Sequence, residues 1–513
     1  MRVIKIGGIT FAIVKRKKFT LEKVLVTGYA AEGKSMARQD GKVIFIEGAV
    51  PGDVVDVFVS TNKKDWGEGK AVYFHEYSKE RAIPFCRHFG ICGGCKWQML
   101  PYEKQLEYKQ QELVQNFRRI GKIPLPEMMP IIGSDDTIHY RNKLEFTFSN
   151  KEYTEVKPAP LTIKEGVTEQ AISEDSFNFA ESKASPLERF GAATPLGGRA
   201  TGFVGYHVPR LFDKIIDIQE CYLMDDVNNM IRNRIRDFAL ENNYSFYDIK
   251  QHTGWLRNII IRYCTTGELM VNICLGYADE TETKKLLDFV LREVPSITTL
   301  LYTINPKWND TIYDLTPQVY HGKGFVTEQL QEFKFKIGPK SFFQTNTKQA
   351  EKLYSVIKNY AGLSGTETVY DLYCGTGSIG IFLSALAKKI IGVEVIAEAI
   401  QDAKINAALN NISHADFFMG DVIKVCNDEF FAGHGRPDVI ITDPPRAGMH
   451  EKLVQKLLEI AAPKIVYVSC NTATQARDLA LLYEKYDIEK IQPVDMFPHT
   501  HHIECVVLLK LRP

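Results

Sequence analysis

The sequence lacks any apolar run near the roughly 20 residues that a membrane-spanning helix requires. It also lacks a net charge, since 63 Lys and Arg residues balance 63 Asp and Glu residues, so a nucleic-acid partner would be held by local patches. Cysteine is sparse, at ten in 513 residues, and no small-residue cleavage site follows the first apolar run, residues 6–14. We therefore expect a cytoplasmic protein without a disulfide scaffold and without a membrane partner.

What the chain does contain is the composition of a folded protein. Its 45% hydrophobic and 25% charged residues exclude disorder as the main state, and its 513 residues predict about three domains. Residues 1–24 carry seven basic residues and one acidic residue, which suits a solvated arm and a phosphate-binding arm equally well. Residues 20–76 are short β-rich runs, which favour a small barrel. The string Gly41–Asp53 resembles the core of a TRAM domain, an OB-like RNA-binding module, and any other small β-barrel is the alternative.

The hydrophobic pattern divides the chain into three segments. We expect an α/β protein with a basic arm and OB-like β-barrel over residues 1–78, a central α/β domain over 79–335 and a third domain over 336–513. Within the central segment, residues 151–199 have little hydrophobic periodicity and predict a long insertion or loop. From Tyr354 onward strands alternate with helices, which predicts a parallel, Rossmann-like sheet.

The central segment begins with a tight group of cysteines separated by glycines: Cys86, Cys92 and Cys95. Glycines let a backbone fold around a compact metal centre, but three thiolates are too few for a closed site. Cys221 is our choice for the fourth ligand, because Cys264 and Cys274 lie in strand-like runs that are typical of core thiols. Structural zinc usually pairs two CxxC-like knuckles and the second one is missing, so the spacing favours a 4Fe–4S cluster, with zinc as the alternative.

The third segment contains a strand, a glycine-rich turn and a helix over Val369–Gly380. Its glycines have the GxGxxG spacing of a dinucleotide site, so a nicotinamide enzyme is one alternative. The acidic strand end and short turn of Asp371–Gly377 are instead typical of S-adenosylmethionine enzymes. Glu394 ends the next strand and suits ribose hydroxyls, and Asp421 follows a third strand and suits an adenine amino group. We therefore expect methyl transfer.

Reactive residues follow each of the later strands. Asp443-Pro444-Pro445-Arg446 ends a buried strand, and its prolines fix a rigid loop at the carboxyl end, where α/β proteins bind ligands. Cys470 ends the next strand and is a candidate nucleophile, although its position alone is more typical of a buried structural cysteine. Glu504 stands just before the last strand, and the histidines around 499–502 lack the i, i+4 spacing of a metal site.

Five strings together resemble the RNA 5-methyluridine methyltransferase family: Ser341–Asn346, Asp371–Gly377, Asp443–Arg446, Ser469–Asn471 and His502–Glu504. The cysteine group and the TRAM-like barrel are similar to those of members that act on 23S ribosomal RNA, and the resemblance covers nearly the whole chain. There are two departures. The family commonly has proline where Thr472 stands, and the insertion lengthens the gap to Cys221.

The resemblance implies methylation of carbon 5 of a uridine in RNA, most specifically 23S ribosomal RNA, with a transfer RNA uridine as the alternative substrate. It implies that Cys470 adds to carbon 6 of the ring, that Glu504 removes the proton from carbon 5, and that Arg446 or a backbone donor stabilises charge in the ring. It implies S-adenosylmethionine and a 4Fe–4S cluster as cofactors, and we expect a monomer. The residues that would hold S-adenosylmethionine or orient the base are Gln344, Tyr373, Ser378, Glu394, Asp421 and Asp443.

Three other functions stay open from the residues alone. An amino-group N-methyltransferase also uses an Asp-Pro-Pro motif, but it would leave Cys470 without a role. A non-enzymatic RNA-binding protein would bind S-adenosylmethionine weakly. A radical methylthiotransferase also pairs a TRAM domain with an iron–sulfur cluster, but its three-cysteine signature has a different spacing.

Overall fold

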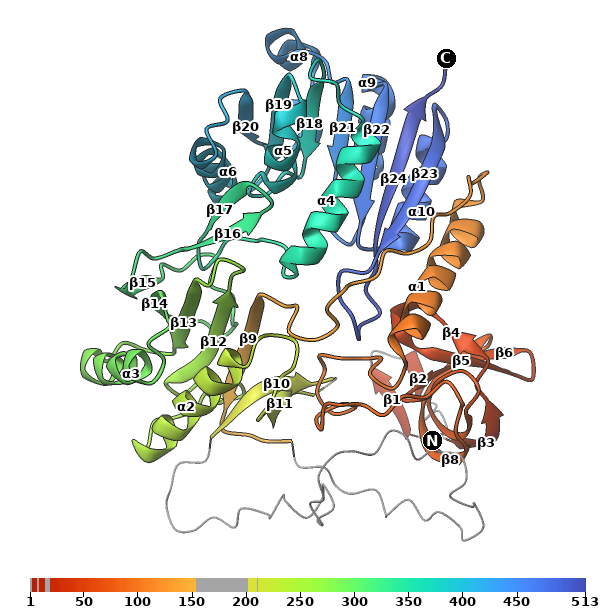
Figure 1. Ribbon diagram of the computed structural model, residues 1–513. Coiled ribbons are helices and arrows are strands. Elements are labelled where there is room, and N and C mark those ends of the chain that lie inside the picture. The colour runs from red at the N-terminus through yellow and green to blue at the C-terminus, as the bar shows by residue number, and fades with distance from the viewer. Residues whose placement is uncertain (1, 7–8, 14–18, 154–201, 210) are drawn as a thin grey trace.

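The computed structural model describes residues 2–6, 9–13, 19–153, 202–209 and 211–513, which contain three large β-sheets (Figure 1). From residue 154 on, the predicted insertion at 151–199 lies outside the described residues, as do residues 1, 7–8 and 14–18 of the predicted basic arm. The expected domain boundaries at residues 78 and 335 stay predictions. No helix in the described ranges combines the length and the apolar character that a membrane crossing would need.

Six strands curl into a half-barrel near the N-terminus (Figure 1). They are β3 (Phe19–Leu25), β4 (Gly28–Tyr29), β5 (Ser35–Gln39), β6 (Lys42–Glu47), β7 (Val54–Asn62) and β8 (Trp66–Glu76), in the sheet order β3-β7-β8-β6-β5-β4. Strand β7 illustrates how the sheet acquires one apolar face, because Val55, Val57 and Val59 are buried and alternate with more exposed residues. A separate antiparallel hairpin is formed by β1 (Arg2–Ile6) and β2 (Ile9–Ile13).

Helix α1 (Tyr102–Asn116) continues into a π-helical turn, Phe117–Gly121, and lies between the half-barrel and the C-terminal sheet (Figure 1). Tyr108 in α1 packs edge-on against Tyr29 of the half-barrel, with ring centroids 4.8 Å apart. Farther along, Leu113 and Phe117 pack into the core of the C-terminal sheet. The helix therefore belongs to two hydrophobic cores.

The central sheet has the strand order β11-β10-β9-β12-β13-β14-β15. Its strands are β9 (Lys143–Ser149), β10 (Phe203–Val208), β11 (Leu211–Asp217), β12 (Leu256–Tyr263), β13 (Leu269–Leu275), β14 (Thr299–Ile304) and β15 (Gln318–His321). Helices α2 (Val227–Glu241) and α3 (Glu280–Glu293) lie beside one another against this sheet (Figure 1). Every residue of β13 is buried, because the strand is in the middle of the sheet and is covered on its faces.

The C-terminal sheet is Rossmann-like, with the order β20-β19-β18-β21-β22-β24-β23. Strands β18 (Thr368–Leu372), β19 (Lys389–Glu394), β20 (Ala415–Met419), β21 (Val439–Thr442) and β22 (Lys464–Ser469) run in parallel. Strand β24 (Glu504–Leu511) is antiparallel to β22 and to the edge strand β23 (Tyr486–Val494). The carboxyl ends of the parallel strands face the other two sheets (Figure 1).

Helices and one hairpin surround this sheet. The helices are α4 (Thr347–Ala361), α5 (Ser378–Leu383), α6 (Ala397–Leu409), α7 (Val422–Val425), α8 (Asp428–His434), α9 (Glu451–Ile460) and α10 (Thr472–Leu482). The hairpin of β16 (Val326–Leu330) and β17 (Phe333–Ile337) packs into the same core as α4. Strands β18, β21 and β22 are almost completely buried, as the near-continuous apolar runs predict for a sheet covered on both faces.

Candidate active site

The carboxyl edge of the C-terminal sheet collects most of the predicted site residues. Leu372 at the end of β18 pairs with Val393 of β19 on one side and with Thr442 of β21 on the other. The residues that follow these positions therefore lie next to one another at one edge. They are Tyr373, Glu394 and Asp443, with Asp421 following β20 and Cys470 following β22.

The glycine turn after β18 is held to the end of β19 by Glu394. One carboxylate oxygen of Glu394 accepts a hydrogen bond from the backbone N–H of Gly375 at 3.3 Å, and the other accepts from the N–H groups of residues 395 and 396. Gly377 has φ +77°, and a Cβ there would lie 2.9 Å from the ring of Phe417, so only glycine fits. The turn therefore presents bare backbone to the space above the strand ends.

The hydroxyl of Tyr354 in α4 lies under this turn, 2.8 Å from the hydroxyl of Ser378. Burial first, and then the charges of Asp443, Asp371 and Glu504, raise the pKa of the Tyr354 phenol, while its hydrogen bond with Ser378 lowers it. No pattern in the sequence singles out Tyr354, because a tyrosine in an amphipathic helix is typical of a core residue. Gln344, the last of the predicted cofactor residues, lies just before α4, and its backbone carbonyl accepts a hydrogen bond from the Asn142 side chain.

The structure brings Cys470 and Glu504 together at adjacent strand ends. Ser469 at the end of β22 pairs with Cys505 of β24, so the residues beside this pair are Cys470 and Glu504. The side chain of Gln475 in α10 donates 3.1 Å hydrogen bonds to the backbone carbonyls of Tyr467 and Cys505, which bridges the two strands. The relative position of the thiol and the carboxyl is thus fixed by backbone pairing and by a buried amide.

Burial and neighbouring carboxyls perturb these two groups. Burial first, and then Glu504 and Asp443, raise the pKa of the Cys470 thiol to about 11, while Arg446 lowers it. Burial and Asp443 raise the pKa of Glu504 well above its ordinary value, against the effect of Arg446. Burial also raises the pKa of Asp443 to about 7. Arg446 is therefore the cation that favours the ionised forms of both reactive groups.

The predicted departure at Thr472 has a structural partner. Its hydroxyl accepts a 2.8 Å hydrogen bond from the side-chain amide of Asn116 at the end of α1. The neighbouring Asn471 caps α10, accepting hydrogen bonds from the N–H groups of residues 473 and 474, and donates to the backbone carbonyl of Arg446. The start of α10, directly after Cys470, is thus bonded to α1 and to the Asp-Pro-Pro-Arg loop.

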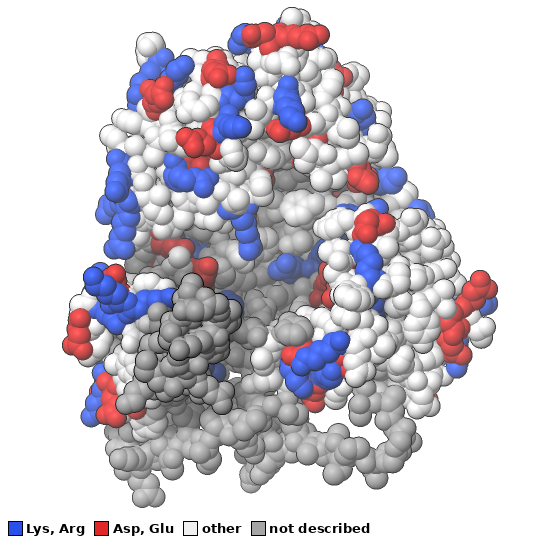
Figure 2. Space-filling view, turned by 180° about the vertical axis from the view of Figure 1, so that it is seen from behind, with Lys and Arg blue, Asp and Glu red and all other residues white. Residues whose placement is uncertain are grey.

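A cleft of about 1160 Å³ extends from Cys470 toward the half-barrel and the cysteine segment. Its charged lining comprises five basic and three acidic residues: Lys34, Lys70, Arg81, Lys96, Arg446, Glu32, Glu47 and Glu112. Figure 2 shows Lys and Arg side chains interspersed with Asp and Glu side chains over one face of the molecule, with a hollow between its upper and lower parts. The lining thus has two more basic than acidic residues, although Lys34 and Arg81 form ion pairs with Glu68 and Asp53 outside it, so Lys70, Lys96 and Arg446 carry the positive character of the cleft.

Two of the three predicted histidines line this cleft. Burial and nearby cations lower the pKa of His501 to about 4 and that of His502 to about 3, so both rings are neutral at neutral pH. A ring nitrogen of His502 lies 3.4 Å from the guanidinium of Arg446. His499 points away from the cleft and is bonded to Gln105 instead.

The four predicted cysteine ligands share a second, small cavity. Cys86, Cys92, Cys95 and Cys221 all line it, while Cys264 and Cys274 lie in other cores. Burial and the neighbouring thiols raise the pKa values of Cys92 and Cys95 to about 12. In the described part of the chain, no group of three or more His, Cys, Asp or Glu side chains is arranged closely enough to hold a metal ion.

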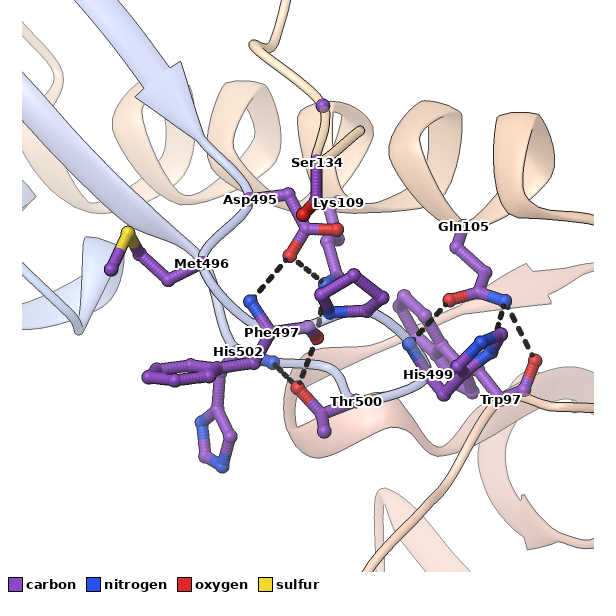
Figure 3. Close-up of polar contacts among 12 residues, drawn as sticks. Trp97, Gln105, Lys109, Ser134, Asp495, Met496, Phe497, His499, Thr500 and His502 are labelled. Atoms are coloured by element: carbon purple, nitrogen blue, oxygen red, sulfur yellow. Dashed lines mark hydrogen bonds and ion pairs between the residues drawn. The ribbon is translucent and has the colours of Figure 1, made fainter. Parts of the chain in front are cut away.

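A buried polar cluster that the sequence did not reveal anchors the loop before Glu504 (Figure 3). Lys109 of α1 and Asp495 form an ion pair of 2.6 Å in which neither side chain is exposed. The backbone N–H groups of Lys96 and Trp97, next to Cys95, both donate to the carbonyl of His499. In the sequence, the position of Lys109 on the apolar face of α1 indicates a buried partner, but that partner, Asp495, lies 386 positions away.

Comparison with known proteins gives three consistent results. Residues 317–512 match the family described as tRNA (Uracil-5-)-methyltransferase. An uncharacterized RNA methyltransferase of Bacteroides thetaiotaomicron is 50% identical over 486 residues, which cover 94% of this chain and 100% of that protein. One from Porphyromonas gingivalis is 45% identical over 488 residues, 94% of this chain and 98% of that protein.

Among solved structures, the chain is similar to the Pyrococcus abyssi tRNA (uracil-54, C5)-methyltransferase in complex with S-adenosyl-L-homocysteine. The TM-score is 0.68 at 26% sequence identity, and the match covers 95% of this chain and 100% of that one. The similarity therefore extends over the half-barrel, the central sheet and the C-terminal sheet together.

Proposed function

Because the chain belongs to the family of S-adenosylmethionine-dependent RNA (uracil-5-)-methyltransferases, we propose that Cys470 is its nucleophile and Glu504 its general base. The observation that carries this proposal is the placement of the thiol and the carboxyl at adjacent ends of β22 and β24, with Cys470 lining the cleft and Glu504 buried beside it. The glycine turn and its acidic residues lie at the same edge of the sheet. A methyl donor and a uracil ring can thus meet above these strand ends.

The reaction proceeds by addition, methyl transfer and elimination. Bound S-adenosylmethionine supplies an electrophilic methyl group. The Cys470 thiolate forms a bond to carbon 6 of uracil, and the electron pair released at carbon 5 takes the methyl group while S-adenosylhomocysteine leaves. Glu504 then accepts the proton of carbon 5. The electron pair of that bond restores the ring double bond, and the bond between sulfur and carbon 6 breaks.

Arg446 and the acids at the strand ends have separate tasks in this scheme. Arg446 stabilises the Cys470 thiolate and the charge that develops in the ring, since it lowers the pKa of the thiol from the open side of the site. Glu394 and Asp421 hold the ribose and the adenine of the methyl donor, and Tyr373 and Ser378 line its place on the glycine turn. Gln344 and Asp443 orient the base and the sulfonium group.

A uridine of 23S ribosomal RNA is the substrate that we propose. The half-barrel and the four-cysteine cavity support it, because the resemblance stated above associates a TRAM-like barrel and a cysteine cluster with members that act on this RNA. A transfer RNA uridine is the second candidate, and the similarity to the Pyrococcus abyssi enzyme favours it. The target base must leave its stack in either RNA to reach Cys470. A cytoplasmic location stays a prediction.

We propose a 4Fe–4S cluster as the second cofactor, because the four cysteines line one small cavity, although their side chains must move closer together than they lie here to bind it. Burial first, and then the neighbouring thiols, raise the pKa of Cys86, Cys92 and Cys95, and a cationic centre would offset this by binding them as thiolates. The backbone N–H of Gly94 already donates to the sulfur of Cys92 at 3.4 Å, which is a common environment for a cluster ligand. Such a cluster would hold the cysteine segment in place, and no redox step is required of it.

Two variants test the roles of Cys470 and Glu504. Cys470→Ala should neither methylate RNA nor bond to it, whereas Glu504→Gln should accumulate a methylated covalent complex that survives denaturing electrophoresis. Cys426→Ala is the control, because Cys426 is a free cysteine that is buried in the core beside α9, away from the cleft. A Cys470→Ala enzyme that still methylates uracil contradicts the mechanism. Parallel reactions on 23S ribosomal RNA and on transfer RNA distinguish the two substrates.

A further inference from the structure

The loop that leads to Glu504 is held from one side by a single helix. This loop, Asp495–Ile503, connects β23 to β24, and α1 lies along it (Figure 3). The Lys109 ammonium donates to the Asp495 carboxylate at 2.6 Å and to the backbone carbonyl of Phe497 at 3.2 Å. One side chain therefore bonds to two points of the loop.

Neighbouring groups complete the arrangement. The hydroxyl of Tyr102 donates to the second Asp495 oxygen at 2.8 Å, and the backbone N–H of Phe497 donates to the first at 3.0 Å. One turn along α1 from Tyr102, the Gln105 side chain accepts a hydrogen bond from the N–H of His499 at 2.8 Å. The Asp495 carboxylate has three donors, so the loop has little freedom to shift relative to α1.

A fully buried ion pair is a costly way to gain stability alone. Lys109 and Asp495 are both unexposed, and well-packed apolar residues of similar size are often as stabilising as such a pair. Directional bonds are what an ion pair adds, because an ammonium bonded to a carboxylate and a carbonyl fixes an orientation that methylene groups would not.

The same helix also reaches the segment that follows Cys470. Asn116 lies seven residues after Lys109, almost on the same face of α1, and donates its 2.8 Å hydrogen bond to Thr472. Lys109 thus bonds to the loop that precedes the carboxyl, and Asn116 bonds to the helix start that follows the thiol. Contacts with one helix therefore hold the segments next to both reactive groups in place.

We propose that Lys109 and Asn116 are positioning residues, two turns apart on α1, which set the places of Glu504 and Cys470 respectively. This inference rests on the proposed roles of Glu504 and Cys470. Neither positioning residue touches a reacting atom. Each should affect a different step of the reaction, and a merely structural role would not produce that difference.

The test is a single-turnover comparison of variants with radioactive S-adenosylmethionine, in which methyl transfer and release of free RNA are followed separately. Lys109→Met should leave methyl transfer within about threefold of wild type but slow elimination about 100-fold, so that the methylated covalent complex accumulates. Asn116→Ala should instead slow formation of the complex about fivefold without trapping it. RNA affinity should stay within twofold in both variants.

Three further variants make the result interpretable. Lys104→Met is the matched control, because Lys104 lies on the same helix and forms ion pairs at the surface. Lys109→Arg keeps both donors and should restore most of the elimination rate. If Lys109→Met does not fold, Tyr102→Phe replaces it, since it removes one donor from Asp495 and keeps the ion pair.

Glu504→Gln is measured in parallel to separate two kinds of failure. If Glu504→Gln traps no complex, the proposed role of Glu504 is wrong. If Glu504→Gln traps the complex but folded Lys109→Met or Tyr102→Phe eliminates at the wild-type rate, the positioning inference alone is overturned. A Lys109→Met enzyme whose steps all slow by the same factor also overturns it.

Discussion

The pKa of Cys470 leads to a quantitative prediction about the pH dependence of methyl transfer. Burial, Glu504 and Asp443 raise this pKa to about 11, so at pH 7.5 only about 0.03% of the thiol is ionised in the free enzyme. The thiolate is the nucleophile, so activity is gained as pH rises toward the pKa and lost as pH falls. The rate of methyl transfer should therefore rise with pH between 6 and 8.5 by up to about tenfold per unit, with a smaller slope near pH 7, where Asp443 ionises and raises the pKa of the thiol.

Substitution of Arg446 should shift the pH dependence of the methyl-transfer rate. Arg446 is exposed, and solvent screens its interaction with the Cys470 thiolate. We therefore take a stabilisation of the thiolate near the low end of the range for a charge-assisted hydrogen bond, about 1.4 kcal/mol, which corresponds to about one unit of the thiol pKa. Arg446→Ala should therefore raise the pKa of the thiol further and lower the rate about tenfold at every pH in this range. Arg446→Lys keeps the charge and should lie between the two enzymes.

The assay is the first-turnover transfer of a labelled methyl group into RNA. This step precedes proton removal by Glu504, so its pH dependence reports on Cys470 rather than on the base. Arg436→Ala is the control, since Arg436 forms an exposed ion pair with Asp428. A flat profile from pH 6 to 8.5, or an Arg446→Ala enzyme with the wild-type rate, would refute the reasoning.

Three further predictions concern the cofactors and the RNA. Glu394→Ala should weaken binding of S-adenosylmethionine at least tenfold and leave RNA affinity unchanged, as equilibrium dialysis can measure, because its carboxylate closes the glycine turn. The double variant Lys70→Ala, Lys96→Ala should weaken RNA binding about tenfold at 0.1 M salt and reduce the salt slope by about 1.4. Protein purified without oxygen should contain about four iron atoms per chain by elemental analysis, and Cys221→Ala should lose them.

Each of these predictions has a matched control on the same molecule. Glu398→Ala, in the first turn of α6, should bind S-adenosylmethionine normally. Lys284→Ala with Lys285→Ala, on α3, should leave the salt slope unchanged. Cys264→Ala should keep its iron, because Cys264 is in a different core. Stoichiometric zinc in place of iron would contradict the cluster proposal.

The sequence predicts the parallel part of the fold well, because that part is encoded locally. Continuous apolar runs separated by helices produce a parallel sheet, and the comparisons bear out the Rossmann-like fold. Since parallel strands end at one edge, the placement of Glu394 and Asp443 at the same edge of the sheet, on either side of β18, is consistent with the sequence pattern. The short alternating strands likewise anticipate a curled N-terminal sheet, which is a half-barrel, while its assignment as an OB-like TRAM domain stays a prediction.

Long-range pairing is what the sequence could not supply. Glu504 stands before a strand, but only the insertion of β24 antiparallel to β22 brings it beside Cys470. Lys109 lies on the apolar face of its helix, but nothing local indicates that Asp495 is the residue that neutralises it in the interior. Such pairs depend on how separate sheets pack, and the residues that form them are hundreds of positions apart.

The membership of helix α1 in two cores has a consequence for how the molecule unfolds. Tyr108 packs in a small cluster with Tyr29 and Val50 of the N-terminal part and Leu113 packs with the C-terminal sheet, so α1 cannot leave either place without exposing apolar surface. Native-state hydrogen exchange should then find the amides of α1 among the slowest in the chain, protected by the global free energy of unfolding. The half-barrel would then unfold together with the C-terminal sheet as one cooperative unit, although among the described residues the two sheets share no hydrogen-bonded strand.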